Sequence, residues 1–189
     1  SDFFGFVGLK FTVGANPLTV TALGRYCALT NAGTHTLKLA RVSNGADVPG
    51  GSVLVSMLGG MPGSYKYANL AAPVVLAPHT AYYLVSEEAG STDLWNDLDT
   101  TVVVDPNVTC DGAVFIGSGF DWTLASGPNH AFGPVNLQYS LGPSIILTTP
   151  SPSVRNGDSI LLNAAVSDFT GSITKVEYYH GATKLSETS

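Results

Sequence analysis

The chain has 189 residues, of which 44% are hydrophobic and only 12% are charged, and its formal net charge is -6. This apolar content suffices for a core and excludes a disordered chain, while 21 Gly and 11 Pro favour many short strands and turns. The sequence lacks a run of about 18 apolar residues, as a membrane helix requires, and Ser1 does not open a signal peptide, so we expect a soluble chain with no membrane insertion.

Charge is distributed unevenly along the chain. Residues 1–66 carry five bases and two acids, residues 67–142 carry eight acids and no base, and residues 143–189 carry three bases and four acids. An acidic surface repels phosphate groups and other anions. The middle segment is therefore not expected to bind nucleic acid or anionic polysaccharide, and a neutral or cationic ligand is favoured.

Apolar and polar residues alternate in short segments, which is typical of half-buried strands. We predict strands over residues 3–13, 18–29 with a bulge at Gly24, 34–42, 53–58, 65–70, 74–76, 81–85, 101–105, 113–117 and 135–141. Asn44-Gly45 and Pro49-Gly50-Gly51 are predicted turns. Strands of this number and spacing predict an all-β fold, an antiparallel two-sheet β-sandwich of jelly-roll-like type over residues 1–142.

A domain boundary is predicted at Gly142-Pro143, where the character of the sequence changes. The following segment contains Pro150 and Pro152, Gly157-Asp158, Asp168, Gly171, KVEYY at 175–179 and GATKL at 181–185. Residues 143–189 thereby resemble bacterial immunoglobulin-like modules. The resemblance implies the N-terminal part of an immunoglobulin-like β-sandwich, whose remaining strands belong to a longer parent protein or to another chain.

The first domain has a resemblance of its own. GLKFTVG at 8–14, GTHTLKL at 33–39 and VVLAPHTAYYLV at 74–85 are similar to bacterial secreted β-sandwich modules appended to polysaccharide-degrading or surface proteins. This resemblance implies an extracellular, secreted or cell-surface location.

Two tryptophans lie among acidic and amide side chains, a composition that suits a sugar-binding site. An aromatic ring packs on the C–H face of a sugar while polar groups bind its hydroxyls. The alternative is that both tryptophans are core residues. The candidate ligand-binding residues are Trp95, Asn96, Asp97, Trp122, Tyr65 and Tyr67.

The acidic loop offers a structural calcium site at Asp93, Asp97 and Asp99, since Ca²⁺ takes oxygen ligands. The alternative is a solvated acidic surface, because the loop lacks the glycine and distal glutamate of an EF-hand. His35 is expected to hydrogen-bond locally, and Arg25-Tyr26 to pack across the sheets.

Catalysis is not predicted. The four histidines are scattered, nucleophile-elbow and HExxH motifs are missing, and Glu87 or Glu88 with Asp97 is weak support for glycoside hydrolysis. Cys27 and Cys110 are the only cysteines and are either one disulfide or two buried thiols.

The sequence therefore predicts a non-catalytic extracellular accessory module that binds a neutral carbohydrate. The alternative is a structural spacer or assembly subunit of a bacterial surface protein, which self-associates, or joins other domains of its parent protein, through residues 143–189.

Overall fold

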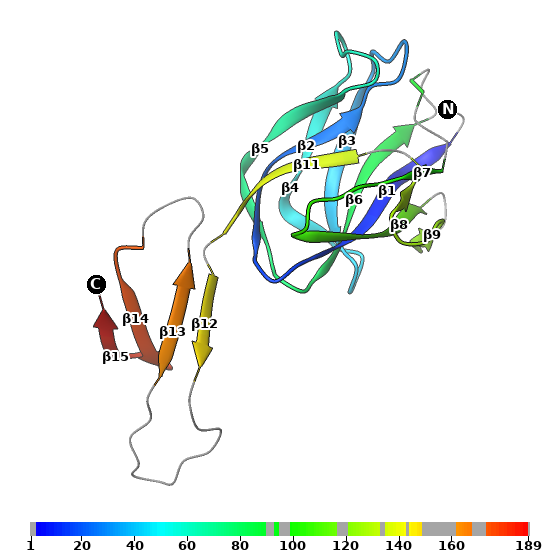
Figure 1. The fold of residues 1–189 in the computed structure, drawn as a ribbon. Coiled ribbons are helices and arrows are strands. Elements are labelled where there is room, and N and C mark those ends of the chain that lie inside the picture. Colours follow the sequence, from blue (N-terminus) through cyan, green and yellow to red (C-terminus); the bar gives the residue numbers. More distant parts are fainter. Residues whose placement is uncertain are drawn as a thin grey trace. The chain divides into compact units, whose positions relative to one another are not determined.

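The structure is a computed structural model, and it describes residues 3–89, 93–94, 99–116, 121–132, 135–142, 144–148, 162–167 and 173–188. These residues form antiparallel strands and no helix (Figure 1). Within the same ranges there is accordingly no helix long and apolar enough to cross a membrane. The all-β antiparallel fold predicted from the sequence is confirmed.

The chain divides into two compact units, Ser1–Ser140 and Leu141–Ser189. The division falls next to Gly142-Pro143, where the sequence predicts a boundary.

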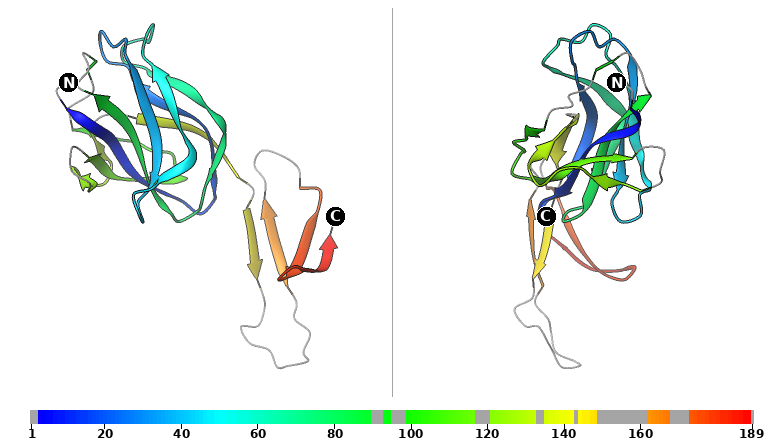
Figure 2. Two further views of the ribbon diagram at one scale, coloured as in Figure 1. Left: turned by 180° about the vertical axis from the view of Figure 1, so that it is seen from behind. Right: turned by 90° about the vertical axis from the view of Figure 1, so that its right-hand side faces the viewer.

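The larger sheet of the first unit has six strands in the order β4-β3-β6-β1-β8-β9. Their bounds are β1 Phe4–Val13, β3 Thr34–Arg41, β4 Asp47–Ser56, β6 Ala81–Ala89, β8 Val108–Ile116 and β9 Thr123–Leu124. The smaller sheet has three strands in the order β11-β2-β5, with bounds β2 Leu18–Tyr26, β5 Tyr65–Leu76 and β11 Val135–Leu141. Two short strands, β7 Thr100–Thr101 and β10 His130–Ala131, pair with each other. Figure 2 shows the same strands from behind and from the side.

Both sheets contribute to one core. The fully buried side chains include Leu37, Leu39 and Leu84 from the larger sheet, and Leu18, Val20 and Leu76 from the smaller one. Leu84 lies beside Leu39 on β3 and Leu9 on β1, so these leucines share the core face of the larger sheet. Gly8 permits the close pairing of β1 and β6, because a Cβ there would lie 2.1 Å from the carbonyl oxygen of Leu84.

The alternating residues of the larger sheet point to its second face. Lys38 pairs with Val85 and Ala40 with Tyr83, and Val114 joins Ala40, Tyr83 and Val85 in a buried apolar cluster there. Phe6, Val42 and Trp122 pack against this cluster. The larger sheet is therefore apolar on both faces.

Two strands are longer than the sequence predicts, because bulges absorb their breaker residues. In β4, Ser52 pairs with Lys38 and Asp47 with Ala40, so residues 48–51 lie opposite Leu39 alone. Pro49-Gly50-Gly51 is thus a bulge inside a strand and not a turn, with Gly50 at φ 73°. The Asn44-Gly45 turn is confirmed between β3 and β4, with Gly45 at φ 69°.

In β5, the predicted break before Val74 is wrong. Val74 pairs with Val20 and Asn69 with Ala22, so residues 70–73, which include Pro73, lie opposite Thr21 alone. The irregularity expected at Gly24 is therefore at Thr21. Gly24 instead makes room for Tyr67, whose ring carbons would lie 2.5 Å from a Cβ at that position.

Other strand ends differ as well. The strand predicted over 101–105 is limited to β7, and the strand predicted over 113–117 is β8, which begins earlier. Cys27 and Cys110 are both buried and free, so they are two thiols and not a disulfide. Burial, the largest influence, raises the pKa of the Cys110 thiol.

The second unit contains two antiparallel strand pairs in its described ranges. β12 (Ser144–Thr148) pairs with β13 (Asn163–Ser167), and β14 (Val176–His180) pairs with β15 (Thr183–Thr188). Side-chain hydrogen bonds from Lys175 and then from Lys184, whose Nζ lies 2.8 Å from Oε1 of Glu177, lower the pKa of Glu177 to about 2. These strands agree with the β-structure that the sequence predicts for residues 143–189, and the immunoglobulin-like type of this unit stays a prediction.

Candidate functional site

Trp122 stacks on Tyr83 over the second face of the larger sheet. Their ring centroids are 4.5 Å apart and their planes differ by 22°. Tyr83 comes from β6, and Trp122 immediately precedes β9, whose Thr123 pairs with Phe115 of β8. The short edge strand thus fixes the backbone beside the indole ring, which is half-buried.

A hollow of about 760 Å³ opens around this pair of rings and is called the Trp122 hollow below. Its walls come from β1, β3, β6, the end of β8, the turn between β3 and β4, and the residues before β9. The lining includes Phe6, Lys38, Asn44, Tyr83, Asp121 and Trp122. This volume lies within the range of about 300–1,000 Å³ that is usual for ligand pockets.

The β3–β4 turn sets one wall of the hollow. Gly45 takes a positive φ that few other residues adopt, and a Cβ there would lie 3.5 Å from Nε1 of Trp122. Asn44 stabilises the turn by accepting the backbone N–H of Ala46 on its Oδ1, at 3.1 Å. The Asn-Gly turn therefore places an amide side chain at the rim, next to the edge of the indole ring.

Three polar groups of the hollow have no hydrogen-bond partner among the described residues. They are the indole N–H of Trp122, the amide nitrogen of Asn44 and the carboxylate of Asp121. The hollow thus offers two donors and one anionic acceptor next to aromatic rings. A ligand with hydroxyl groups would satisfy all three.

Lys38 is the cation of the hollow and is already paired. Its Nζ lies 2.8 Å from Oδ1 of Asp47 and 4.2 Å from the ring centroid of Phe6. Only 18% of the lysine side chain is exposed. The aliphatic stem of Lys38 therefore adds apolar surface, while its charge is largely neutralised by Asp47.

Tyr65 and Tyr67 belong to a different place in the first unit. The ring centroid of Tyr65 lies 6.2 Å from that of Tyr67 and 5.9 Å from that of Tyr26. Burial, and then the charge interactions with Tyr67 and Tyr26, raise the pKa of Tyr65. Tyr65 lines a crevice of about 340 Å³ together with Leu9 and Leu84. Because Leu9 and Leu84 lie on the core face of the larger sheet, these tyrosines do not join Trp122 in one site.

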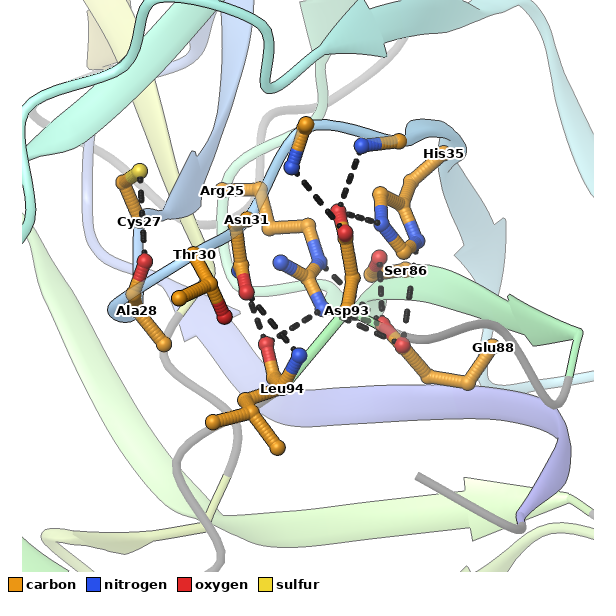
Figure 3. Close-up of polar contacts among 12 residues, drawn as sticks. Arg25, Cys27, Ala28, Thr30, Asn31, His35, Ser86, Glu88, Asp93 and Leu94 are labelled. Carbon is orange, nitrogen blue, oxygen red and sulfur yellow. Dashed lines mark hydrogen bonds and ion pairs between the residues drawn. The ribbon is translucent and has the colours of Figure 1, made fainter.

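The opposite, core-facing side of the larger sheet holds a second polar group of residues (Figure 3). We call it the buried network; it comprises Arg25, Asn31, His35, Ser86, Glu88 and Asp93, all at most 7% exposed. Arg25 of β2 binds Glu88 of β6 through Nε and Nη2 at 3.1–3.2 Å, and Ser86 donates to Glu88 at 3.0 Å. A buried ion pair therefore bridges the two sheets.

Asp93 is the second anion of the buried network. Its Oδ1 and Oδ2 accept the backbone N–H groups of Ala32 and Gly33 at 3.0 and 2.8 Å. Burial alone raises the pKa of this carboxyl, but the hydrogen bonds from Ala32, His35 and Gly33 outweigh it and the pKa is lowered. Asp93 is thus an ionised internal anchor and not part of a solvated surface.

His35 connects Asp93 to β6. Its Nδ1 lies 2.9 Å from the carbonyl oxygen of Glu87, and its Nε2 lies 3.1 Å from Oδ2 of Asp93. These contacts hold the imidazole ring between Asp93 and the backbone of β6. The expectation that His35 bonds locally is wrong, since its partners are 52 and 58 residues away.

Asn31 makes two hydrogen bonds to the backbone of Leu94, the residue that follows Asp93. The Asn31 amide donates to the Leu94 carbonyl at 2.8 Å, and the Leu94 N–H donates to Asn31 Oδ1 at 2.9 Å. Arg25 also donates to the Leu94 carbonyl, at 3.2 Å. Figure 3 shows the hydrogen bonds of Asp93 and of Leu94 side by side, and together they attach residues 93–94 to the core.

The remaining predicted site residues are dispersed. Trp95, Asn96 and Asp97 lie outside the described residues. Asp99 pairs with His130 at 3.0 Å, on the surface. In the part of the chain that the structure describes, no three His, Cys, Asp or Glu side chains are grouped so as to hold a metal ion.

The fold recombines charges that the sequence keeps apart. Acids of the middle segment pair with bases of the first: Glu88 with Arg25, and Asp111 with Lys10 at 3.7 Å. The sequence predicted either a calcium site or a solvated surface for these acids, and it did not predict the buried network. One signal was available, because Glu88 continues the alternation of Leu84 and Ser86.

Comparison with known proteins gave no match to a family model, to a curated protein or to a solved structure.

Proposed function

We propose that this protein is a non-catalytic extracellular accessory module that binds a neutral carbohydrate in the Trp122 hollow. The observation that carries the proposal is the combination, in one hollow, of stacked aromatic rings and unpaired polar groups. The bacterial, secreted setting and the jelly-roll-like type of the first domain belong to the same proposal and rest on the sequence.

The aromatic part of the hollow suits the apolar face of a sugar ring. Tyr83 supports the indole from one side, which holds Trp122 in place without a ligand. A preorganised ring loses little conformational entropy on binding. Phe6 and the stem of Lys38 extend the apolar surface.

The polar part of the hollow suits sugar hydroxyls. A hydroxyl both donates and accepts, so it can bind the indole N–H of Trp122, the amide of Asn44 and the carboxylate of Asp121. The groups of the buried network lack this capacity, because they are already bonded to one another. This contrast supports the hollow as the place where a ligand binds.

Affinity electrophoresis in gels containing neutral polysaccharides tests the proposal. We expect retardation of the wild-type protein by at least one polysaccharide and normal migration of Trp122→Ala. Trp95→Ala, measured in parallel, reports whether the other tryptophan also contributes. Tyr179→Ala is the control for loss of an aromatic residue, since Tyr179 is 54% exposed in the second unit. Retardation that survives in Trp122→Ala would place the site elsewhere.

The second candidate function is a structural spacer or assembly subunit. It is supported by exposed apolar side chains of the second unit: Leu147, Ile173 and Leu185 are 58%, 42% and 60% exposed. Light scattering over a range of concentrations should show oligomers that disappear when residues 143–189 are deleted. A monomer at all concentrations would contradict self-association through the second unit and leave the carbohydrate proposal intact.

A further inference from the structure

We infer that the Trp122 hollow prefers an amino sugar whose amine is protonated over the corresponding neutral sugar. This inference rests on the proposed function, since it names the sugar class that the same hollow would take. It is carried by three features of the hollow: its charge balance, its aromatic rings and its open donor and acceptor groups.

The charge balance of the hollow favours a cation. Lys38 is the one lysine among the described residues that line the hollow, and Asp47 neutralises this lysine at 2.8 Å. Asp121 has no partner among the described residues, so one negative charge remains uncompensated. A ligand ammonium group beside Asp121 would compensate that charge, whereas a carboxylate or sulfate would be repelled.

The rings of the hollow also favour a cation. A positive charge is attracted to the face of Trp, Tyr or Phe within about 6 Å of the ring centroid. The hollow already contains one such contact, because Nζ of Lys38 lies 4.2 Å from the centroid of Phe6. The Trp122 and Tyr83 rings lie in the same hollow as the unpaired Asp121. A ligand cation can therefore interact with a ring and a carboxylate together.

An amino sugar suits the hollow better than a lysine side chain. A lysine offers an ammonium and an apolar stem, but it leaves the indole N–H of Trp122 and the amide of Asn44 without acceptors. An amino sugar supplies an ammonium for Asp121 and hydroxyl oxygens for both donors. Only the sugar satisfies all three unpaired groups.

Calorimetric titrations with three oligomers of equal length and linkage test the inference. The ligands are β-1,4-linked glucosamine, its fully N-acetylated form and β-1,4-linked glucose, at a pH where the free amine is protonated. An exposed ion pair and an exposed cation–π contact together predict a preference of about three- to tenfold for the glucosamine oligomer. The preference should shrink in 1 M salt, where charges are screened.

Asp121→Asn should bring the ratio of the glucosamine and glucose affinities to about one, and because the readout is this ratio, any loss of affinity that the two oligomers share does not affect it. Glu187→Gln, which removes the same charge from the second unit, should leave the preference unchanged. Equal binding of all three oligomers, or a preference that survives in Asp121→Asn, would overturn the inference and leave the proposed function standing. No binding of any of the three oligomers would overturn the inference, and the polysaccharide gels would then decide the proposed function by themselves. Binding of a lysine-rich peptide through Trp122 and Asp121, with none of the sugars, would overturn the assignment to an amino sugar.

Discussion

The two faces of the larger sheet hold polar groups of the same kinds in opposite states. In the buried network, both oxygens of Glu88 and of Asp93 have partners within 3.2 Å. In the Trp122 hollow, the indole N–H, the Asn44 amide and the Asp121 carboxylate are unpaired among the described residues. Satisfied buried groups stabilise a fold and specify its packing, whereas unpaired groups beside a hollow are available to a ligand.

The largest effect should come from breaking the inter-sheet ion pair by Glu88→Gln. The arginine would stay buried, at 2% exposure, without a counter-charge. Removing one partner of a buried pair costs about 3–5 kcal/mol in the free energy of unfolding. Urea unfolding measures this loss.

The matched control is Glu87→Gln, one residue away. The Glu87 carboxylate has no partner among the described residues, so its change should stay within about 0.5 kcal/mol. Equal losses of unfolding free energy in Glu88→Gln and Glu87→Gln would show that the Glu88 carboxylate is not needed to stabilise the buried charge of Arg25.

A smaller loss, with a defined pH dependence, is expected for Asp93→Asn. Folding lowers the pKa of Asp93 and so favours its ionised form. Its stabilisation is complete above the pKa of an unfolded Asp, about 3.9, and is lost as the pH falls through the lower folded value. The variant should be less stable than wild type by about 1–3 kcal/mol at pH 7.

Urea unfolding of the wild-type protein and of Asp93→Asn at pH 7, 5 and 3 tests the direction of this pH dependence. The difference between their free energies of unfolding should be constant from pH 7 to pH 5 and should become smaller at pH 3. Asp99→Asn is the control, because Asp99 pairs with His130 at the surface with half of its side chain exposed. A difference that widens in acid would contradict the role of Asp93 as an ionised anchor.

Gly45→Ala tests the turn that forms one wall of the hollow. A residue with a Cβ costs about 1–2 kcal/mol in the left-handed region that Gly45 occupies at φ 69°. The new methyl group would only touch Trp122, at 3.5 Å from Nε1, so the loss should come from the backbone. Gly127→Ala is the control, since no atom lies within 4 Å of its Cβ position. Similar stability of the two variants would mean that the turn relaxes without cost.

Local patterns in the sequence predicted the positions of the longer strands of the first unit. Alternation predicted the strand over residues 34–42, which contains the core residues Leu37 and Leu39, and the Asn44-Gly45 pair marked the turn after it, because both signals act between neighbours in the chain. The bulges of β4 and β5 were missed, because Gly and Pro also mark turns. Whether such residues end a strand depends on the strand opposite, which the sequence does not show.

The site residues were predicted less well, because their partners are distant in the chain. Arg25 and Glu88 are 63 residues apart, one in the basic and one in the acidic part of the sequence, so the distribution of charge along the chain did not indicate that they pair. The alternation itself held a signal, since His35 is in phase with the core residues Leu37 and Leu39. Trp122 was selected for its polar neighbours, but only the fold shows that Tyr83 supports it.

Asp121→Asn should have the smallest effect on stability. It replaces a carboxylate by an amide, as Asp93→Asn does, but at an exposed residue with no partner among the described residues. Its free energy of unfolding should therefore stay within about 0.5 kcal/mol of wild type. Urea unfolding at pH 7 of the two Asp→Asn variants provides the comparison. A large loss in Asp121→Asn would mean that this carboxylate stabilises the fold, and the distinction between the network and the hollow would fail. An unchanged stability would leave Asp121 free for a ligand, because the protein gains nothing from it in the unbound state.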